Sequence, residues 1–189
     1  NPALTASYTG FVNGENLASS GINGSVSLTT SAVTSSAAGS YTINASAGTM
    51  ISDNYSLVFV NGKLTIEKAV LTITAENITK TYGSSNPSLT VRYDGFVNGE
   101  TLSTAALTGQ YSIGTNAVTG SNAGVYPITV SAGTLASVNY ALQFVNGTLT
   151  IDKALLTLTA DPKAKNYGEA NPTLTATWSA FVNGQTIGT

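Results

Sequence analysis

Two lysines that directly follow an acidic residue have the types and spacing that best fit covalent chemistry. Lys68 follows Glu67, and Lys153 follows Asp152. A lysine buried beside an asparagine and a carboxylic acid can form an amide cross-link, because desolvation makes the amine a nucleophile. The sequence does not show burial, so junction salt bridges or solvated charges are the simpler interpretation of both pairs.

Composition excludes most other catalytic chemistry. The 189 residues include no His and no Cys, which removes the commonest general base, thiol nucleophiles, the usual zinc ligands and disulfides. Thr and Ser number 29 and 21, but a hydroxyl nucleophile needs a base, and only a Ser-Lys dyad is formally open. Asp94 and the pair Asp53-Asn54 are isolated, whereas calcium recruits clustered oxygen ligands. We predict no catalytic residue, no metal and no cofactor.

Charge and hydropathy restrict the partners. Seven basic and nine acidic residues give a net charge of −2, so nothing drives binding to phosphate backbones and nucleic acid is not an expected partner. The longest apolar stretches, such as Leu57 to Val60, are far too short to span a bilayer. The chain starts at Asn1 without Met or a visible signal peptide, and we expect it to be part of something longer.

An internal repeat organises the chain. Asn1-Pro2 recurs as Asn86-Pro87 and Asn171-Pro172, which is a constant spacing of 85 residues. Residues 1–85 and 86–170 align without a gap and are identical at 47 of 85 positions. A period of this length predicts one compact domain per repeat, because the coil of a solenoid has only about 20 to 45 residues.

The local signals within one repeat are nearly all of strand type. Residues 71–75 and 156–160 alternate apolar and hydroxylic side chains, as a strand with one buried face does. Further strands are predicted over residues 89–93, 126–130 and 140–145, which are rich in β-branched and aromatic residues. A single short helix of one or two turns is predicted over residues 100–107, with a weaker counterpart over 15–20.

Turn-forming residues recur at fixed places in the repeat. Asn146-Gly147 lies between two strand-like segments and predicts a hairpin over residues 142–151 with a type I′ turn, and Asn61-Gly62 predicts its twin over residues 57–66. Tyr82, Gly83, Asn86 and Pro87 recur as Tyr167, Gly168, Asn171 and Pro172. We interpret this motif as a loop in which Gly and Pro fix the turn and Tyr anchors it.

The domain boundaries follow from the junctions. The segment Glu67-Lys68-Ala69 runs from one strand into the next without a Gly- or Ser-rich spacer, and Asp152-Lys153-Ala154 repeats it. Such short junctions predict stiff joints. We therefore place domains at 1–68, 69–153 and 154–189, the first without its opening strand and the last an opening fragment.

Several of these spaced motifs resemble the MBG and YDG repeat domains of large bacterial surface adhesins. They are Tyr82 to Pro87, Tyr93-Asp94-Gly95 through Glu100, Ala123 to Ile128, Asn139-Tyr140 and Gly147 to Ile151. The resemblance covers essentially the whole chain. It implies a secreted or cell-surface protein of tandem β-rich domains, β-grasp-like with at most one short helix each; Ig-like β-sandwich repeats are the alternative fold. Two copies depart from this motif. Thr9 replaces Asp94 in the first copy, and Trp178-Ser179-Ala180 replaces Tyr93-Asp94-Gly95 in the third. An indispensable role for Asp94 is therefore not expected.

The function predicted from this resemblance is a structural stalk or fibre-forming array of an extracellular adhesin or filament. The alternative is an adhesive module that binds glycan or host protein through Asn and aromatic side chains; turns and half-buried strand faces explain those residues more simply. An ice-binding surface of Thr-x-Thr strings is disfavoured, because an 85-residue period cannot stack ladders at a strand spacing of about 4.8 Å.

The expected partners are neighbouring repeats of the same protein. Residues 154–170 repeat the opening element that residues 1–68 lack. An unpaired strand edge is a template for another chain. As an isolated fragment the chain is expected to associate head to tail, with the C-terminal strand of one molecule completing the first domain of the next. In a longer array the preceding repeat of the same polypeptide would supply that strand instead, and no exchange would be needed.

Overall fold

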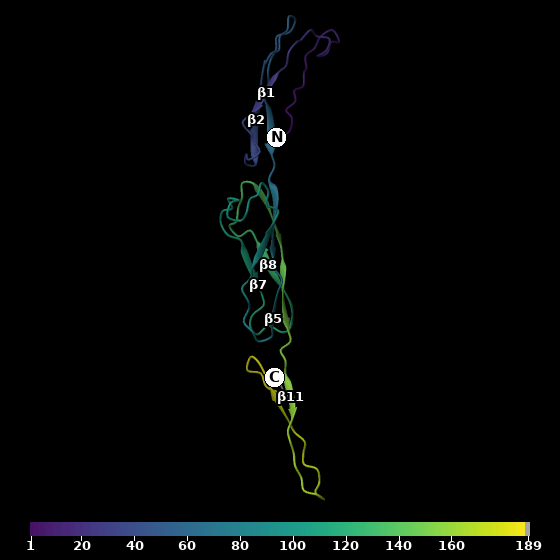
Figure 1. Ribbon diagram of the computed structural model, residues 1–189, viewed down its shortest axis with the longest axis vertical. Coiled ribbons are helices and arrows are strands. Elements are labelled where there is room, and N and C mark those ends of the chain that lie inside the picture. Colours follow the sequence, from purple (N-terminus) through teal and green to yellow (C-terminus); the bar gives the residue numbers. More distant parts are fainter. Residues whose placement is uncertain (188–189) are drawn as a thin grey trace. The chain divides into compact units, whose positions relative to one another are not determined.

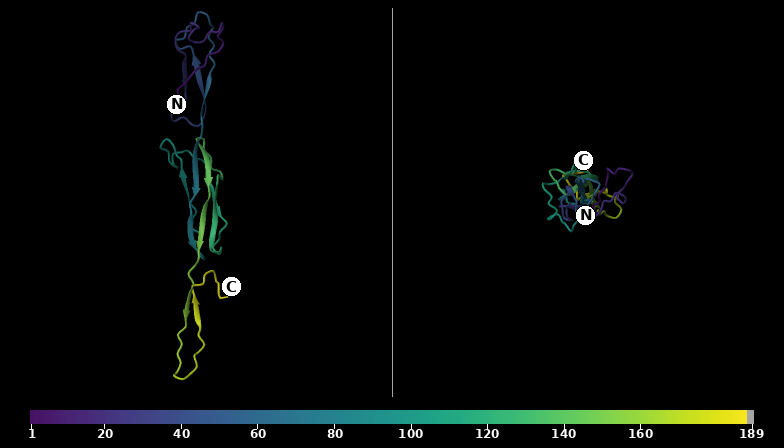
Figure 2. Two further views of the ribbon diagram at one scale, coloured as in Figure 1. Left: turned by 90° about the vertical axis from the view of Figure 1, so that its right-hand side faces the viewer. Right: turned by 90° about the horizontal axis from the view of Figure 1, so that it is seen from above.

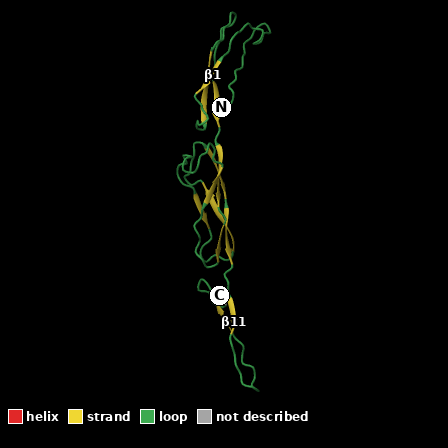
Figure 3. Ribbon diagram, in the orientation of Figure 1, coloured by secondary structure: helices red, strands yellow, loops and turns green. Residues whose placement is uncertain are grey.

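The computed structural model describes residues 1–187, and strands are the only regular secondary structure in that range (Figures 1 and 3). The mainly β class is thereby confirmed. The strands are β1 Ser27–Thr30, β2 Gly39–Ser46, β3 Gly62–Ile66, β4 Ala69–Ala75, β5 Ile78–Thr81, β6 Val91–Asp94, β7 Ser112–Thr115, β8 Gly124–Ser131, β9 Tyr140–Val145, β10 Gly147–Asp152, β11 Thr157–Ala160 and β12 Ala176–Ser179.

The chain divides into two compact units. Unit 1 comprises residues 1–70, 95–107 and 137–141, and unit 2 comprises residues 71–94, 108–136 and 142–189. The first, second and third copies of the repeat are residues 1–68, 69–153 and 154–189, and the counterpart of a residue lies 85 positions away. Unit 1 therefore holds the first copy together with residues 69–70, 95–107 and 137–141 of the second.

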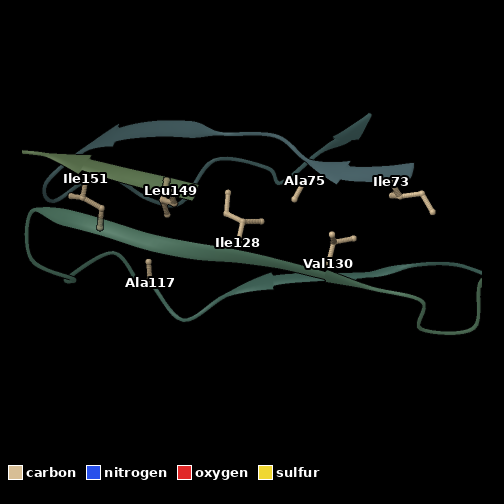
Figure 4. Packing of buried hydrophobic residues seen from close by; sticks show 7 residues of the cluster. All are labelled: Ile73, Ala75, Ala117, Ile128, Val130, Leu149 and Ile151. Carbon is tan, nitrogen blue, oxygen red and sulfur yellow. The ribbon is translucent and has the colours of Figure 1, made fainter. Parts of the chain in front are cut away.

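Unit 2 is built around a core between two sheets. One sheet has the strand order β5-β10-β8-β7 and the other β6-β4-β9. β10 runs parallel to β5 and antiparallel to β8, while β4 pairs antiparallel with β6. Figure 4 shows the side chains that meet between the strands: Ile73, Ala75, Ala117, Ile128, Val130, Leu149 and Ile151.

Alternation along β4 explains its central place in that core. Leu71, Ile73 and Ala75 are at most 2% exposed, whereas the threonines between them are half-buried. The strand predicted over residues 71–75 is thus confirmed, because its apolar face lies in the core. Residues 126–130 fall within β8, and the prediction over 140–145 coincides with β9.

The predicted hairpins at Asn146-Gly147 and Asn61-Gly62 are wrong. β9 and β10 belong to different sheets, so Asn146 marks a crossover, and none of these four residues has a positive φ. The Asn146 side chain accepts a hydrogen bond from the Val130 amide at 3.0 Å, which replaces a strand partner at the crossover. Glycine is needed at position 147 for a steric reason instead, because a Cβ there would lie 2.5 Å from the carbonyl oxygen of Ala75.

Type I′ geometry occurs at the repeat's other Asn-Gly pair. Asn98 and Gly99 have φ of 55° and 70°, and the Glu100 amide donates to the Val97 carbonyl at 3.0 Å. The pairs 13–14 and 183–184 have the same positive φ values to within a few degrees. Positive φ at both central residues is what a type I′ turn requires, and Asn and Gly tolerate it best.

The short helix predicted over residues 100–107 does not form. The Ala105 amide donates to the Thr101 carbonyl at 2.9 Å, which makes one isolated turn. Ala106 follows with φ of 49° and turns the chain out of the helical path. The weaker candidate over residues 15–20 likewise has a single such bond, from the Ser20 amide to Asn16.

Unit 1 contains the sheet β1-β2-β3, whose strands β1 and β2 are labelled in Figure 1. β1 and β2 are the counterparts of β7 and β8, and β3 is the counterpart of β10. Residues 6–9 and 55–60, the counterparts of β6 and β9, are not strands. β4 and β5, residues 69–81, correspond to positions before residue 1 in the 85-residue repeat.

The third copy contributes the two-stranded ribbon β11-β12 to unit 2, drawn at the yellow end of the colour scale (Figure 2). Leu158 pairs with Trp178 and Ala160 with Ala176, which is the register of β4 with β6 shifted by 85 residues. All residues of both strands are exposed. The third copy thus has the same strand pair in the same register, although its residues are exposed.

Candidate functional site

The loop that follows β5 is held by a buried lysine, Lys80. Lys80 lies on β5 and is 7% exposed. Its Nζ donates to the Asn86 Oδ1 at 2.8 Å and to the carbonyls of Ser84 and Val118 at 3.0 Å each. The Asn86 Nδ2 in turn donates to the Ala117 carbonyl at 2.6 Å. In the first copy, the Asn1 Nδ2 donates to the carbonyl of Ala32, the counterpart of Ala117.

This arrangement holds a loop rather than activating a nucleophile. A lysine ammonium has three N–H donors, and all three acceptors around Lys80 are neutral oxygens. An amide cross-link to Asn86 would need a free amine and a neighbouring carboxylic acid. Lys68 and Lys153, where the sequence suggested such chemistry, are both exposed. The Lys68 Nζ donates instead to the Ser137 carbonyl at 2.8 Å.

The Tyr82-Gly83 motif closes the same loop. The Tyr82 amide donates to the Asp152 carbonyl at 2.8 Å, and the half-buried ring packs against the core. Gly83 has φ of 87°, and a Cβ there would lie 2.8 Å from the Cβ of Val182. Both its backbone angle and its neighbour therefore demand glycine. Pro87, directly after Asn86, is half-buried.

A second recurring motif joins the Asn-Gly turn to a distant tyrosine. The Tyr140 hydroxyl accepts from the Val97 amide at 3.1 Å and donates to the Glu100 carboxylate, so it bridges both ends of the turn. Its ring meets Phe96 edge-on at 5.9 Å. Tyr55 repeats these contacts with Val12, Glu15 and Phe11.

The tyrosine and carboxylate pair has an electrostatic signature. The hydrogen bond to Glu100 raises the pKa of Tyr140 above its ordinary value, as Glu15 does for Tyr55. The ionised phenol would have no proton to donate and would face a carboxylate. The motifs in the sequence did not predict this role for either Glu residue. The sequence does contain a matching spacing, because Glu15 precedes Tyr55 and Glu100 precedes Tyr140 by the same 40 residues.

Tyr93, Asp94 and Gly95 serve separate local roles. The Tyr93 ring contacts Tyr111 edge-on at 6.5 Å, and its pKa is raised, chiefly by burial. Asp94 forms an exposed ion pair with Arg92, its neighbour on the same strand. Gly95 has φ of 109° and leads the chain into the next loop. The structure does not gather these residues into one site with Lys80 and Asn86.

The junction between the first and second copies lies within unit 1 and is hydrogen-bonded. The Asn139 Oδ1 accepts from the Ala38 amide at 3.0 Å, and the Asn139 carbonyl accepts from the Ala69 amide at 3.0 Å. The Lys68 Nζ adds a bond to the Ser137 carbonyl at 2.8 Å, so two hydrogen bonds join the first copy to the second beside the link of Glu67 and Lys68. Asn139 belongs to the recurrent Asn-Tyr pair, whose role at the junction the sequence did not show.

Within residues 1–187 no group of three or more carboxylates is placed to hold a metal ion. No helix in that part of the chain is long and apolar enough to cross a membrane. What the copies share is a set of loop-holding contacts on a β framework. These features define a tandem β-repeat whose recurrent polar residues fasten loops and copies together.

Comparison with known proteins identifies the family. The model of the MBG domain (YGX type) matches residues 1–65, 71–150 and 156–189. The chain belongs to this family, because the matches cover most of its length. Domains of this kind occur as repeats in extracellular surface proteins. No curated protein and no solved structure matches the chain.

Proposed function

We propose that this chain is a structural segment of an extracellular bacterial surface protein, in which each copy adds length to a stalk. The observation that carries the proposal is the hydrogen-bonded junction around Asn139. A stalk transmits position only when consecutive domains keep a fixed orientation, and flexible Gly- and Ser-rich linkers do not provide this. A folded unit of this size adds on the order of 30 Å per copy.

Two features of the first junction support a stiff joint. The link from β3 to β4 consists of Glu67 and Lys68 alone. Two hydrogen bonds cross the junction, from the Ala38 amide to Asn139 and from the Lys68 Nζ to Ser137. Contacts beside a short link restrict bending, whereas a covalent link alone does not.

The second junction has equivalents of two residues of the first. In unit 2, a cleft of about 370 Å³ is lined by Ala123 and Lys153, among other residues. These two are the counterparts of Ala38 and Lys68, which donate the hydrogen bonds at the first junction. Because the same residues return at the same spacing, a regular array follows if every copy docks on the next in this way.

Distance measurements between spin labels test the joint. Thr34 and Thr119 are exposed counterparts in the first and second copies, and the chain has no Cys that would compete for the label. We expect a narrow distance distribution between labels at Thr34→Cys and Thr119→Cys. Inserting a Gly-Ser repeat after Lys68 should at least double its width, because the added residues behave as a random coil.

Two asparagine variants separate the junction from general stability. Asn139→Ala removes the bond to Ala38 and should broaden the distribution. Asn54 is the exposed counterpart of Asn139 and lies outside this junction, so Asn54→Ala should leave the width of the distance distribution unchanged. An equally broad distribution in the parent protein and the Gly-Ser variant would refute the stalk. Saturable binding of immobilised glycans by the intact chain would favour the adhesive alternative.

A further inference from the structure

The chain enters and leaves the second copy through two segments that lie side by side. Residues 69–82, the entry segment, contain β4 and β5, and residues 139–152, the exit segment, contain β9 and β10. β4 is the neighbour of β9 in one sheet, and β5 is the neighbour of β10 in the other. Any tension along the chain therefore passes into and out of the copy through these two neighbouring segments.

The two segments run in the same direction. In one sheet, residues 78–81 pair in parallel with residues 149–152. At the start of both segments, the Ala69 amide donates to the Asn139 carbonyl at 3.0 Å. Because the segments are joined at their first residues and again near their last, their parallel course extends over their whole length.

Hydrogen bonds also join the two segments where the chain changes sheets and where β5 ends. The Thr148 amide and hydroxyl both donate to the Asn77 Oδ1, at 2.8 and 3.0 Å. Beyond the end of β5, the Tyr82 amide donates to the Asp152 carbonyl at 2.8 Å. Neither the crossover between the sheets nor the end of the strands therefore leaves the two segments unconnected.

The entry and exit segments also share one core. Ile73 and Ala75 come from the entry segment, Leu149 and Ile151 come from the exit segment, and all four are at most 2% exposed (Figure 4). Interiors of this kind are close-packed. Sliding one segment past the other therefore displaces packed side chains as well as breaking hydrogen bonds.

The parallel course decides how tension acts on these contacts. Tension pulls the start of the entry segment and the end of the exit segment in opposite directions, which slides the two parallel strands along each other. All the hydrogen bonds between them then share the load and must break together. Two strand ends that lie opposite each other, when pulled apart, open one bond at a time. Shared loading requires the larger force, because several bonds are lost in one step.

We propose that the entry and exit segments form a load-bearing clamp, which keeps the second copy folded when the chain is under tension. This function goes beyond the stiffness of the joints, since it concerns the resistance of one copy to unfolding. It rests on the proposed stalk function, because a stalk is pulled through both ends of each copy. β7 and β8 complete the core but do not lie between the two points at which the load enters and leaves.

Single-molecule measurements at constant force test the clamp on the intact chain. The chain has no Cys, so two introduced cysteines decide where the handles pull. Glu67→Cys with Lys153→Cys slides the clamp, whereas Ser85→Cys with Lys153→Cys pulls apart the ends of β5 and β10; all three sites are exposed. At the same force, we expect the folded state to last at least tenfold longer in the first geometry.

The length of the step identifies the copy that unfolds. Complete unfolding between positions 67 and 153 lengthens the tether by up to about 300 Å, at about 3.5 Å per extended residue. The first and third copies lie outside the handles, so neither contributes to this step.

Two asparagine variants separate the clamp from general stability. Asn77→Ala removes the bonds to Thr148, which connect the entry and exit segments, and should shorten the lifetime in the sliding geometry about fivefold. Asn146→Ala is the matched control, because the Asn146 Oδ1 also accepts a backbone amide, that of Val130 on β8. It should change that lifetime by less than about twofold. Urea unfolding verifies that both variants are folded.

Two results would overturn the proposal. Equal lifetimes in the two pulling geometries show that the parallel pair does not carry the load. Equal shortening by Asn77→Ala and Asn146→Ala shows that the bonds between the entry and exit segments have no special part in resisting tension. The spin-label distances report on the joint between copies, whereas these lifetimes report on the interior of one copy, so either proposal can fail without the other.

Discussion

Replacing Gly147 with alanine tests the crossover between the two sheets of unit 2. A Cβ at this position would lie 2.5 Å from the Ala75 carbonyl oxygen and 2.9 Å from that of Glu76. Both atoms belong to the backbone, at the last residue of β4 and the residue after it, so no side chain can rotate away. The first copy supplies a matched control. A Cβ at Gly62, the counterpart, would lie 3.5 Å from the Ile43 Cβ, which is ordinary contact.

The expected loss follows from the contacts that must move. Relief to an ordinary separation of about 3.5 Å requires a shift of about 1 Å, and overpacking of this kind costs about 1–3 kcal/mol. The shift also weakens the bond from the Thr148 amide to the Asn77 Oδ1, which is 2.8 Å long; one such bond contributes about 1 kcal/mol. Replacing a strand glycine with alanine returns about 0.5–1 kcal/mol of chain entropy. We expect Gly147→Ala to destabilise unit 2 by about 2–3 kcal/mol and Gly62→Ala to change unit 1 by less than about 0.5 kcal/mol.

Urea unfolding followed by amide NMR signals reads the two units separately. The amide of Ile128 on β8 reports on unit 2, and that of Ile43 on β2 reports on unit 1. The reasoning fails if Gly147→Ala destabilises unit 2 by no more than Gly62→Ala destabilises unit 1. The two positions are distinguished by the backbone of Ala75 and Glu76, which lies close to Gly147 alone. It also fails if Gly147→Ala lowers the stability of unit 1 rather than that of unit 2.

Three further outcomes are expected. Lys80→Met removes the charged donor of three hydrogen bonds, to the oxygens of Ser84, Asn86 and Val118, and should lower the stability of unit 2 by about 2–4 kcal/mol in the same urea assay. The raised pKa of Tyr140 means that its contribution to stability is complete below pH 10.0 and is lost as pH rises through the higher folded value; Tyr140→Phe should remove this alkaline dependence of unfolding. The pKa of Asp161 lies below its ordinary value of 3.8, chiefly because the Thr175 hydroxyl donates to it, so its contribution is present above that pH and is lost as pH falls through the lower folded value. Thr175→Val should raise that pKa in a carboxyl NMR titration.

The dipeptide Asn-Gly shows how far local sequence predicts this fold. At Asn98-Gly99 it forms the type I′ turn that the pair favours. At Asn146-Gly147 it forms a crossover with ordinary backbone angles, because β4 passes within contact distance of Gly147. The difference comes from a strand more than 70 residues earlier in the chain, and no local pattern contains it. The repeat and the period-two strands needed only local signals and were predictable.

The lysines show the same limit for the candidate site. Lys68 and Lys153 attract attention in the sequence because each adjoins an acid, yet the structure exposes both. Lys80 is the buried one, and one of its acceptors is the carbonyl of Val118, 38 residues away. Burial depends on which loop folds over a side chain, so it cannot be read from neighbouring residues. The recurrence of Lys80 as Lys165 was the available signal.

The three copies together show which strand decides the fold of a repeat. The counterpart of β6 is a strand in the third copy, where β11 pairs with it, and is not a strand in the first copy, where residues 6–9 have no such neighbour. Residues 55–60 likewise lack the strand structure of β9 despite retaining Leu57 and Phe59. Local β propensity is therefore insufficient at these positions, and pairing supplies the rest. Pairing with β4 or β11 thus accompanies strand structure in the segments equivalent to β6.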